Sequence, residues 1–414
     1  MITIGQPYIK ESGDRICLVS HVSNEGEGKE LDVFYSVEPK YREYLCDETA
    51  DAFVLPLLLR AVVSNQDIRI DAPISEKLYH NLRYGVLYAL SHARKTTPKI
   101  YGLKPPTTAI KKVDISCSTL VAYNYHAKGV GTGCSLGVDS FSVIKKYLFN
   151  DDCLPSYKIT HFACFNVGAF GSFNTEETRK SFYNEVERLK VFAQQLNMPV
   201  VSVDTNLHEF YPEKNFNLSH SFLNMGCVLA FQKLWGKYLY AAGYSLDRFK
   251  WDLGDSAKYE PYVVSQLSTE SVELISSDME KSRSDKVRYI MDDPLVKQNI
   301  TVCLKEQSIN NGKMVRDKDK GYRNCGRCEK CLRTMLQLDI YGRLNDYNDV
   351  FDLSDWSKLK FDFLSKVLAL KDKNLMYNDI ASTIDNNNYP IPSKVKRRAK
   401  IMKLRQFIKS IVRG

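Results

Sequence analysis

The sequence predicts an α/β protein with a parallel, doubly wound sheet, an α+β domain before it and a helical extension after it. Three observations lead to this fold class. Between residues 118 and 340, short apolar segments alternate with segments of helical apolar spacing. A glycine-rich turn follows the first of these strands, and residues 345–387 carry only helical patterns with polar joints. Strands separated by helices of this length build a parallel sheet, and such sheets bind ligands at the carboxyl ends of their strands.

Residues 1–115 are expected to form a separate α+β domain. Runs of strand-forming residues predict two strands, and helical apolar spacing predicts two helices, the first with Asp47 as its N-cap. The domain carries no chemical motif, so we expect it to bind substrate or to shape a homo-oligomer. Its segments are strands 15–20 and 31–37 and helices 47–63 and 75–92.

The domain of residues 118–340 is expected to alternate strand and helix along its whole length. Apolar runs bounded by turn residues predict its strands, and longer amphipathic segments predict its helices. The expected strands are 129–134, 158–167, 199–204, 238–244 and 272–275, and the expected helices are 141–149, 175–196, 221–235, 261–267 and 332–338.

The charge of the chain is concentrated at one end. The net charge is +9, and residues 394–414 hold nine basic residues and no acidic one, so the rest of the chain is neutral. The first residues lack a basic start followed by an apolar run, and the longest apolar stretch, 52–63, is too short to span a bilayer. We therefore expect a cytoplasmic protein, peripheral to a membrane if the tail binds one.

The basic tail has largely helical apolar spacing. A basic amphipathic helix is typical of segments that bind an anionic membrane surface or another polyanion, although a solvated chain end would show the same composition. Because the rest of the chain is neutral, tRNA is the less expected partner. The apolar residues of the tail are Val395, Ile401, Leu404, Ile408 and Ile411.

The turn Ser135-Leu136-Gly137-Val138-Asp139-Ser140 is a candidate phosphate site. A turn that follows a parallel strand and opens a helix directs unpaired N–H groups and the helix dipole at an anion. Gly137 allows close backbone approach, Ser135 and Ser140 offer hydroxyl groups, and Asp139 is a candidate Mg²⁺ ligand. The turn fits neither the Walker P-loop nor the Rossmann fingerprint, and a glycine-rich turn without a ligand remains an alternative.

Four cysteines have the spacing of a metal site. Cys325, Cys328 and Cys331 follow the pattern C-x-x-C-x-x-C, and Cys303 lies 22 residues before them. Four thiolates suit a closed tetrahedral zinc site, which would clamp the polar loop 304–324. An iron–sulfur cluster is the main rival, and sulfur carriage is less expected because all four thiols are committed to one site.

The turn and the cysteines together resemble one enzyme superfamily. The turn resembles the Ser-Gly-Gly-x-Asp-Ser loop of PP-loop (N-type) ATP pyrophosphatases, and the late Cys…Cys-x-x-Cys-x-x-Cys pattern is similar to that of 7-cyano-7-deazaguanine synthases of queuosine biosynthesis. The resemblance covers roughly residues 125–335, and Leu136 departs from it by replacing the second glycine. It implies a HUP-like sheet and cleavage of ATP to AMP and pyrophosphate, but not the queuosine precursor as product.

The resemblance also implies roles for single residues. It places Ser135, Leu136, Gly137, Val138, Asp139 and Ser140 on the pyrophosphate and Mg²⁺. It places Asn166, Val167 and Gly243 at the nucleotide. Arg283 and Lys286 are expected to neutralise the leaving pyrophosphate. The expected enzyme is a ligase that adenylates a small-molecule carboxylate or carbonyl for attack by ammonia or an amine. The alternatives are a tRNA-modifying member of the superfamily and a catalytically inactive nucleotide-binding or regulatory module, which Leu136 would favour.

Overall fold

The structure is a computed structural model that describes residues 1–97, 100, 109–171, 175–211, 216–303 and 323–413. Most of the polar loop expected at 304–324, residues 304–322, lies outside the described residues. The chain divides into two compact units. Unit 1 comprises Met1–Ser135 and Lys146–Met279, and unit 2 comprises Leu136–Lys145 and Glu280–Gly414.

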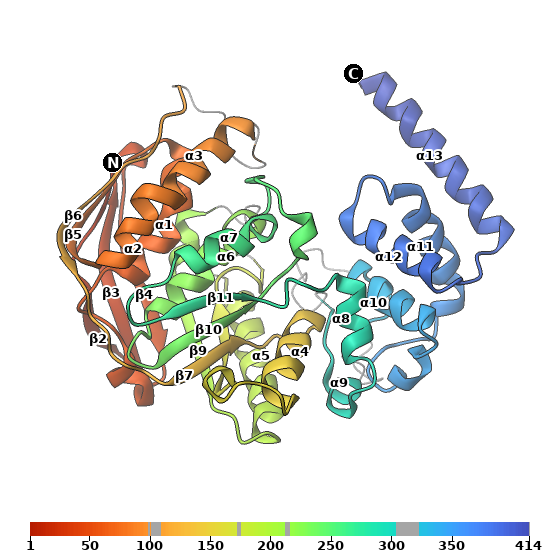
Figure 1. The fold of residues 1–414 in the computed structure, drawn as a ribbon, viewed down its shortest axis with the longest axis horizontal. Helices are drawn as coiled ribbons and strands as arrows, with labels where there is room; N and C mark the ends of the chain where they lie inside the picture. Colours follow the sequence, from red (N-terminus) through yellow and green to blue (C-terminus); the bar gives the residue numbers. More distant parts are fainter. Residues whose placement is uncertain (98–99, 101–108, 172–174, 212–215, 304–322, 414) are drawn as a thin grey trace. The chain divides into compact units, whose positions relative to one another are not determined.

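Unit 1 is built on one mixed, mostly parallel sheet of eleven strands, which makes the protein α/β as predicted (Figure 1). Its five strands from the predicted domain of residues 118–340 are all parallel and lie side by side in the order β11-β10-β7-β8-β9. The first of these strands in the chain, β7, is therefore the central one. The five are β7 (Gly129–Gly133), β8 (His161–Asn166), β9 (Val200–Thr205), β10 (Trp235–Ala241) and β11 (Glu273–Ser277).

Residues 1–121 continue this same sheet instead of building a sheet of their own. Strand β4 pairs antiparallel with β9, with Tyr35 opposite Thr205 and Ser36 opposite Asp204. Every residue of β9 is buried, so β4 covers an edge that would otherwise expose unpaired backbone groups. The boundary expected at residue 115 therefore does not divide the sheet. The additional strands are β1 (Ile2–Ile4), β2 (Tyr8–Ser12), β3 (Arg15–Asn24), β4 (Lys29–Val37), β5 (Ile68–Ser75) and β6 (Ile115–Val121).

Helices cover both faces of the sheet in unit 1. Helix α5 lies on one face, and α1, α6 and α7 pack together on the other, where α1 is also in contact with α3 (Figure 1). Buried side chains of α1, α3, α6 and α7 form one hydrophobic core with buried side chains of the strands. The helices are α1 (Asp51–Ser64), α2 (Glu76–Asn81), α3 (Leu87–Thr96), α5 (Glu176–Gln194), α6 (Phe216–Leu229) and α7 (Glu260–Gln266).

The start of α1 differs from the sequence prediction. The helix begins at Asp51 with Ala50 as its N-cap, so the expectation that Asp47 caps it is wrong. Asp51 is 1% exposed, and its carboxylate accepts hydrogen bonds from the Ser75 N–H at 2.9 Å and from Gln232 Nε2 and Thr49 Oγ1 at 2.8 Å each. These bonds join helix α1 to the strand β5 and to the chain after α6, contacts that local spacing does not reveal.

Asp51 is expected to make stability depend on pH. Burial raises its pKa to about 6, against three hydrogen bonds that lower it. Because the pKa is higher in the folded state, Asp51 contributes its full stabilisation of the fold below the pKa of the unfolded chain. This stabilisation is lost as the pH rises through about 6. Relative to the wild type, Asp51→Asn should therefore gain about 3 kcal/mol of unfolding free energy between about pH 4 and about pH 8. Urea unfolding of both proteins at several pH values checks this, and an unchanging difference would contradict it.

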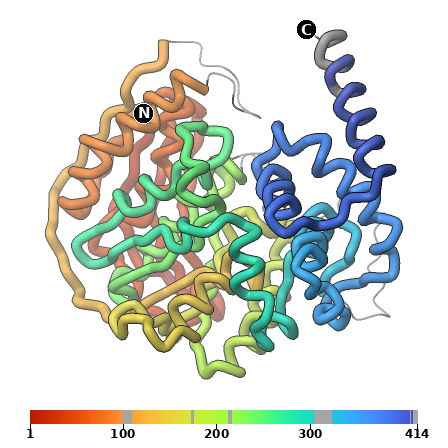
Figure 2. The backbone as a smooth tube through the Cα atoms, turned by 45° about the vertical axis from the view of Figure 1, so that its right-hand side comes forward, coloured from red at the N-terminus to blue at the C-terminus, as the bar shows by residue number. Residues whose placement is uncertain are grey.

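Unit 2 holds the segment of the predicted phosphate turn together with the C-terminal helices. The carbonyl of Leu136 accepts a hydrogen bond from Thr301 N–H at 2.8 Å, and Lys145 Nζ donates to the Tyr289 carbonyl at 2.7 Å. A second hydrophobic core joins α10, α11, α12 and the start of α13. Figure 2 draws the backbone of this part of the chain in blue. The helices are α4 (Val138–Ile144), α8 (Arg283–Ile290), α9 (Pro294–Asn299), α10 (Glu329–Ile340), α11 (Trp356–Leu370), α12 (Leu375–Asn386) and α13 (Ser393–Arg413). Across the described residues, no helix combines the length and the apolar character needed to cross a membrane.

Candidate functional site

The central strand of the parallel sheet leads directly into the predicted phosphate turn. Strand β7 has β8 on one side and β10 on the other, so the direction of strand addition reverses at β7. Parallel sheets bind ligands at the carboxyl ends of their strands at such a reversal. The Cys134 N–H continues the pairing by donating to the Ala163 carbonyl at 2.9 Å, and Ser135 is the next residue. The sequence motif thus begins at the position where the topology places a ligand site.

Two polar groups, at the ends of β8 and β11, lack hydrogen-bond partners among the described residues. Asn166 ends β8, is 4% exposed and donates from Nδ2 to Asp204 Oδ1 at 2.8 Å, but its Oδ1 accepts no hydrogen bond. Ser277 ends β11, is 2% exposed, and its Oγ is likewise without a partner. Buried polar groups are nearly always paired, so these atoms are candidates for contact with a ligand or water.

Val167 and Gly243, the other residues of unit 1 expected at the nucleotide, contact other parts of unit 1. Val167 is 2% exposed and belongs to the hydrophobic core. The Gly243 N–H donates to Glu260 Oε1 at 2.6 Å and is therefore already used. Gly131 in β7 faces the rings of Trp235 and Tyr238, which a β-carbon would approach to 2.9 Å and 2.8 Å. Gly131 therefore leaves space for two aromatic side chains, a role that the glycine-rich pattern alone does not reveal.

Leu136, which stands where the resembling loop has its second glycine, adopts a backbone conformation that favours glycine. Its φ is +53°, in the left-handed region, and its side chain is fully buried. A residue with a β-carbon in this region costs about 1–2 kcal/mol, so burial of the leucine side chain must offset the strain. Gly137 follows in extended conformation as the N-cap of α4.

Asp139, in the first turn of α4, is held by two cations from α8. Arg283 donates to Asp139 Oδ2, and Lys286 Nζ lies 3.3 Å from Asp139 Oδ1. The Asp139 side chain is 29% exposed, whereas that of Lys286 is only 1% exposed. Burial raises the pKa of Asp139, but the charges and hydrogen bonds of the two cations outweigh it and lower the pKa below its usual value. The three predicted catalytic residues thus form one ion-paired cluster.

The start of α8 is fixed so that Arg283 and Lys286 point to the turn segment. Ser282 and Asp285 form a capping box, and the Ser284 N–H and hydroxyl both donate to Asp379 Oδ2 at 2.8 Å. Asp285 and Asp379 were not among the expected site residues, although Ser282 and Asp285 have capping-box spacing in the sequence.

Further basic side chains gather beside Arg283. A small pocket in unit 2 is lined by residues of α8, α10 and α12, and three of its lining residues carry positive charge. Ser140, in the first turn of α4, is 6% exposed. The surroundings of Asp139 therefore carry an excess of positive charge, which suits a polyphosphate. The pocket is lined by Arg283, Lys330, Arg333, Thr334, Gln337, Met376 and Ile380.

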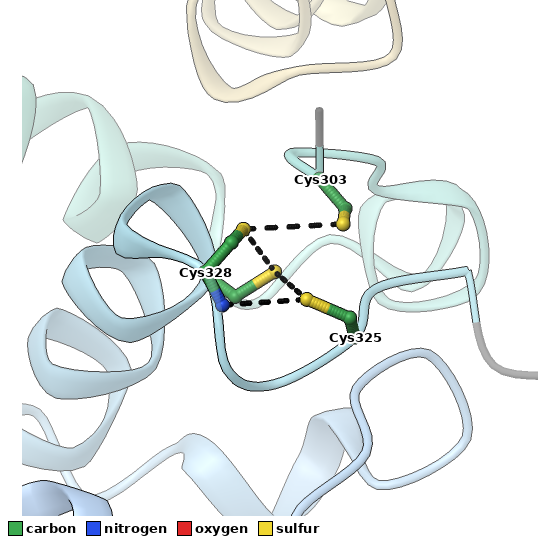
Figure 3. Close-up of side chains that lie close together, drawn as sticks. Cys303, Cys325 and Cys328 are labelled. Atoms are coloured by element: carbon green, nitrogen blue, oxygen red, sulfur yellow. Dashed lines mark hydrogen bonds between the residues drawn. The ribbon is translucent and has the colours of Figure 1, made fainter. Parts of the chain in front are cut away.

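The four predicted metal ligands come together in unit 2. Figure 3 shows three of them, Cys303, Cys325 and Cys328, with their side chains close together. Their sulfur atoms all lie within 4.8 Å of one another, with 3.3 Å between Cys328 and Cys331 and 3.9 Å between Cys328 and Cys303. The Cys328 N–H also lies 3.3 Å from the Cys325 sulfur. Hydrogen bonds from Cys303 lower the pKa of Cys325 and lower the pKa of Cys328 to about 6. The cluster can hold a single metal ion.

Asn324 organises this cluster, although sequence reasoning did not select it. It is fully buried, and its Oδ1 accepts from the N–H groups of Val302 and Cys303 at 2.8 Å and 3.2 Å. Its Nδ2 donates to the carbonyls of Ile300 and Val350 at 2.9 Å and 3.0 Å. One side chain therefore aligns the Cys303 arm with the Cys325 turn.

Arg327, between Cys325 and Cys328 in the chain, connects the cysteine turn to the residues before α11. It forms ion pairs at 2.9 Å with Asp352 and with Asp355. Arg323 donates to the carbonyl and side-chain oxygens of Asn299 at 3.1 Å each. Both arginines therefore tie the cysteine turn to neighbouring segments.

Comparison of the chain with protein-family models, with curated proteins and with solved structures gives no match.

Proposed function

We propose that this protein is a PP-loop ATP pyrophosphatase that adenylates a small-molecule carboxylate or carbonyl and passes it to ammonia or another amine. The observation that carries the proposal is the position of the Ser135–Ser140 turn. The turn leaves the central strand of five parallel strands at the point where strand order reverses. Motif and topology are independent of each other, and both favour an anionic ligand at this turn.

The proposed reaction assigns the handling of the pyrophosphate to the turn and to α8. Arg283 and Lys286 neutralise the charge of the leaving pyrophosphate, and Ser135 and Ser140 donate from their hydroxyl groups to its oxygens. The substrate oxygen attacks the α-phosphorus as the bond to the β-phosphate breaks, and an amine then displaces AMP. Positioning and electrostatics supply most of the rate.

Asp139 is the residue proposed to hold Mg²⁺. A magnesium ion held by Asp139 would supply positive charge that stabilises the negative charge developing on the phosphates. The two cations that now pair with Asp139 keep it ionised, which is the protonation state that a metal ligand needs. Release of Arg283 and Lys286 toward the phosphates would accompany ion binding. The ion-paired cluster also favours a second candidate, an inactive nucleotide-binding module, if the cations never leave the carboxylate.

We further propose that Cys303, Cys325, Cys328 and Cys331 bind structural zinc. A tetrahedron with metal–sulfur bonds of about 2.3 Å has edges of about 3.8 Å, which supports a single ion at the observed sulfur separations. A multi-iron cluster would spread the four thiolates over separate irons and needs wider spacing. Zinc would contribute folding energy to unit 2.

The reaction can be tested with ATP carrying a label on its α-phosphate. The metal-replete protein is incubated with Mg²⁺, ammonium and fractions of a cellular metabolite pool. We expect labelled AMP and pyrophosphate in equal amounts, and only with fractions that hold the substrate. Formation of ADP and phosphate would contradict the proposed cleavage. Tight ATP binding without pyrophosphate release from any fraction would favour the inactive module, and release that requires added tRNA would favour the tRNA-modifying alternative.

A further inference from the structure

Helix α13 has two faces with different surroundings. Val395 and Ala399, four residues apart, are 1% and 7% exposed, and Val395 belongs to the core of unit 2. Arg398 pairs with Asp362 at 2.8 Å, and Lys403 pairs with Asp372 at 2.8 Å. These contacts hold one face of α13, from Val395 to Lys403, against α11 and the residues just after it.

On another face of α13, large apolar side chains are exposed. Ile401, Leu404, Phe407 and Ile408 are 44%, 59%, 61% and 51% exposed. Their spacing of three and four residues puts them on one stripe of the helix. At 3.6 residues per turn this stripe lies roughly opposite the face that holds Val395 and Ala399, so the helices of unit 2 do not cover it. The C-terminal half of α13 extends past α11 and α12 in both views (Figures 1 and 2).

The charge of α13 selects among possible partners for this apolar stripe. The basic residues Lys400 and Arg405 lie beside it and are exposed, and residues 394–414 contain no acidic residue. A second copy of α13 would bring like charges together on both flanks, which opposes self-association. Nucleic acid would pair with the basic residues but leave the apolar side chains in water. An anionic lipid surface satisfies both, because the headgroups pair with the cations and the acyl region receives the apolar side chains.

We propose that the C-terminal half of α13 binds the surface of an anionic membrane and lies in its plane. Ile401, Leu404, Phe407 and Ile408 enter the boundary between headgroups and acyl chains, and the basic residues on either side contact lipid phosphates. The first turns of α13 stay docked on α11, so the protein is held at the bilayer surface by its last helix. The proposal is independent of ATP use by the protein.

The test is flotation of the full-length protein with lipid vesicles. We expect binding at least about tenfold stronger to phosphatidylcholine vesicles containing about 30% phosphatidylglycerol than to pure phosphatidylcholine, and weaker binding as salt increases. The double variant Leu404→Ser/Phe407→Ser should lose about tenfold or more of the affinity, because both side chains are exposed in the free protein. Its thermal unfolding should match the wild type, since neither side chain packs in the core.

A matched control is available in the same unit. Leu375, at the start of α12, is also exposed, at 36%, and Leu375→Ser should leave vesicle binding unchanged. Equal binding to neutral and anionic vesicles would overturn the proposal, as would vesicle binding that the double variant leaves intact. A protein that ignores vesicles but forms dimers abolished by the double variant would assign the stripe to a second copy. Binding to generic RNA that the double variant leaves unchanged, without vesicle binding, would assign the tail to nucleic acid.

Discussion

Gly326→Ala is expected to remove most of the bound metal and to destabilise unit 2 by about 4 kcal/mol or more. Gly326 lies between Cys325 and Arg327 with φ of +65°, and a β-carbon there would lie 1.8 Å from the carbonyl oxygen of Asp352. That oxygen belongs to backbone, so the contact can be relieved only by moving the cysteine turn away from the segment to which Arg327 ties it. The four sulfur atoms would then lose the spacing that a single ion requires.

The measurement combines metal analysis of the gel-filtered protein with thermal unfolding, and Gly342→Ala is the matched control. Gly342 has nearly the same φ, +69°, but a β-carbon there meets no atom within 4 Å. The control should therefore cost only about 1–2 kcal/mol from the left-handed conformation and should keep its metal. Stoichiometric zinc in the Gly326→Ala variant would contradict the expected clash. A wild-type protein that carries iron and absorbs visible light would contradict the choice of zinc.

Asp139→Asn is expected to reduce pyrophosphate release by about a thousandfold or more, because the reaction would lose its proposed Mg²⁺ ligand. The same change leaves the almost fully buried Lys286 and its neighbour Arg283 without their carboxylate. Removing one partner of a buried ion pair typically costs about 3–5 kcal/mol, so the unfolding free energy should fall as well. Activity is therefore compared at a temperature where circular dichroism finds the variant folded.

Asp346→Asn separates the catalytic effect from the loss of an ion pair. Asp346 also pairs with two cations, Lys297 at 3.0 Å and Arg343 at 3.3 Å, but on the surface of unit 2. Exposed pairs of this kind contribute about 0–1 kcal/mol, so this variant should keep its stability and its full activity. Equal activity in the folded Asp139→Asn variant and in wild type would exclude Asp139 as the metal ligand of the reaction.

The sequence predicted most elements of the parallel sheet, since each is a local run of apolar or amphipathic residues. It also selected the four cysteines, and the structure brings all four sulfur atoms together. The sequence did not predict the role of Asn324, because an asparagine before a cysteine carries no local signal. It becomes important only when chain segments on both sides of the loop converge on its amide.

Local pattern failed where distant segments decide the environment of a residue. Asp47 had the position of an N-cap, yet α1 begins at Asp51, whose carboxylate binds groups near residues 75 and 232. Val395 shared helical spacing with Ile401, Leu404 and Ile408 in the sequence, but it packs in a core while the other three are exposed. Helical spacing defines a face, whereas contact with α11 decides which face is covered.

By itself, the sequence determined the α/β class, the composition of the phosphate turn, the thiol set and the concentration of positive charge in the last 21 residues, because these are properties of short segments. Only the tertiary structure decided that residues 1–121 extend the same sheet, that Leu136 takes a positive φ, and that Arg283 and Lys286 both reach Asp139. The physical reason is common to all three. Strand edges, backbone strain and buried charges are stabilised by partners far away in the chain, and local sequence carries little information about such partners.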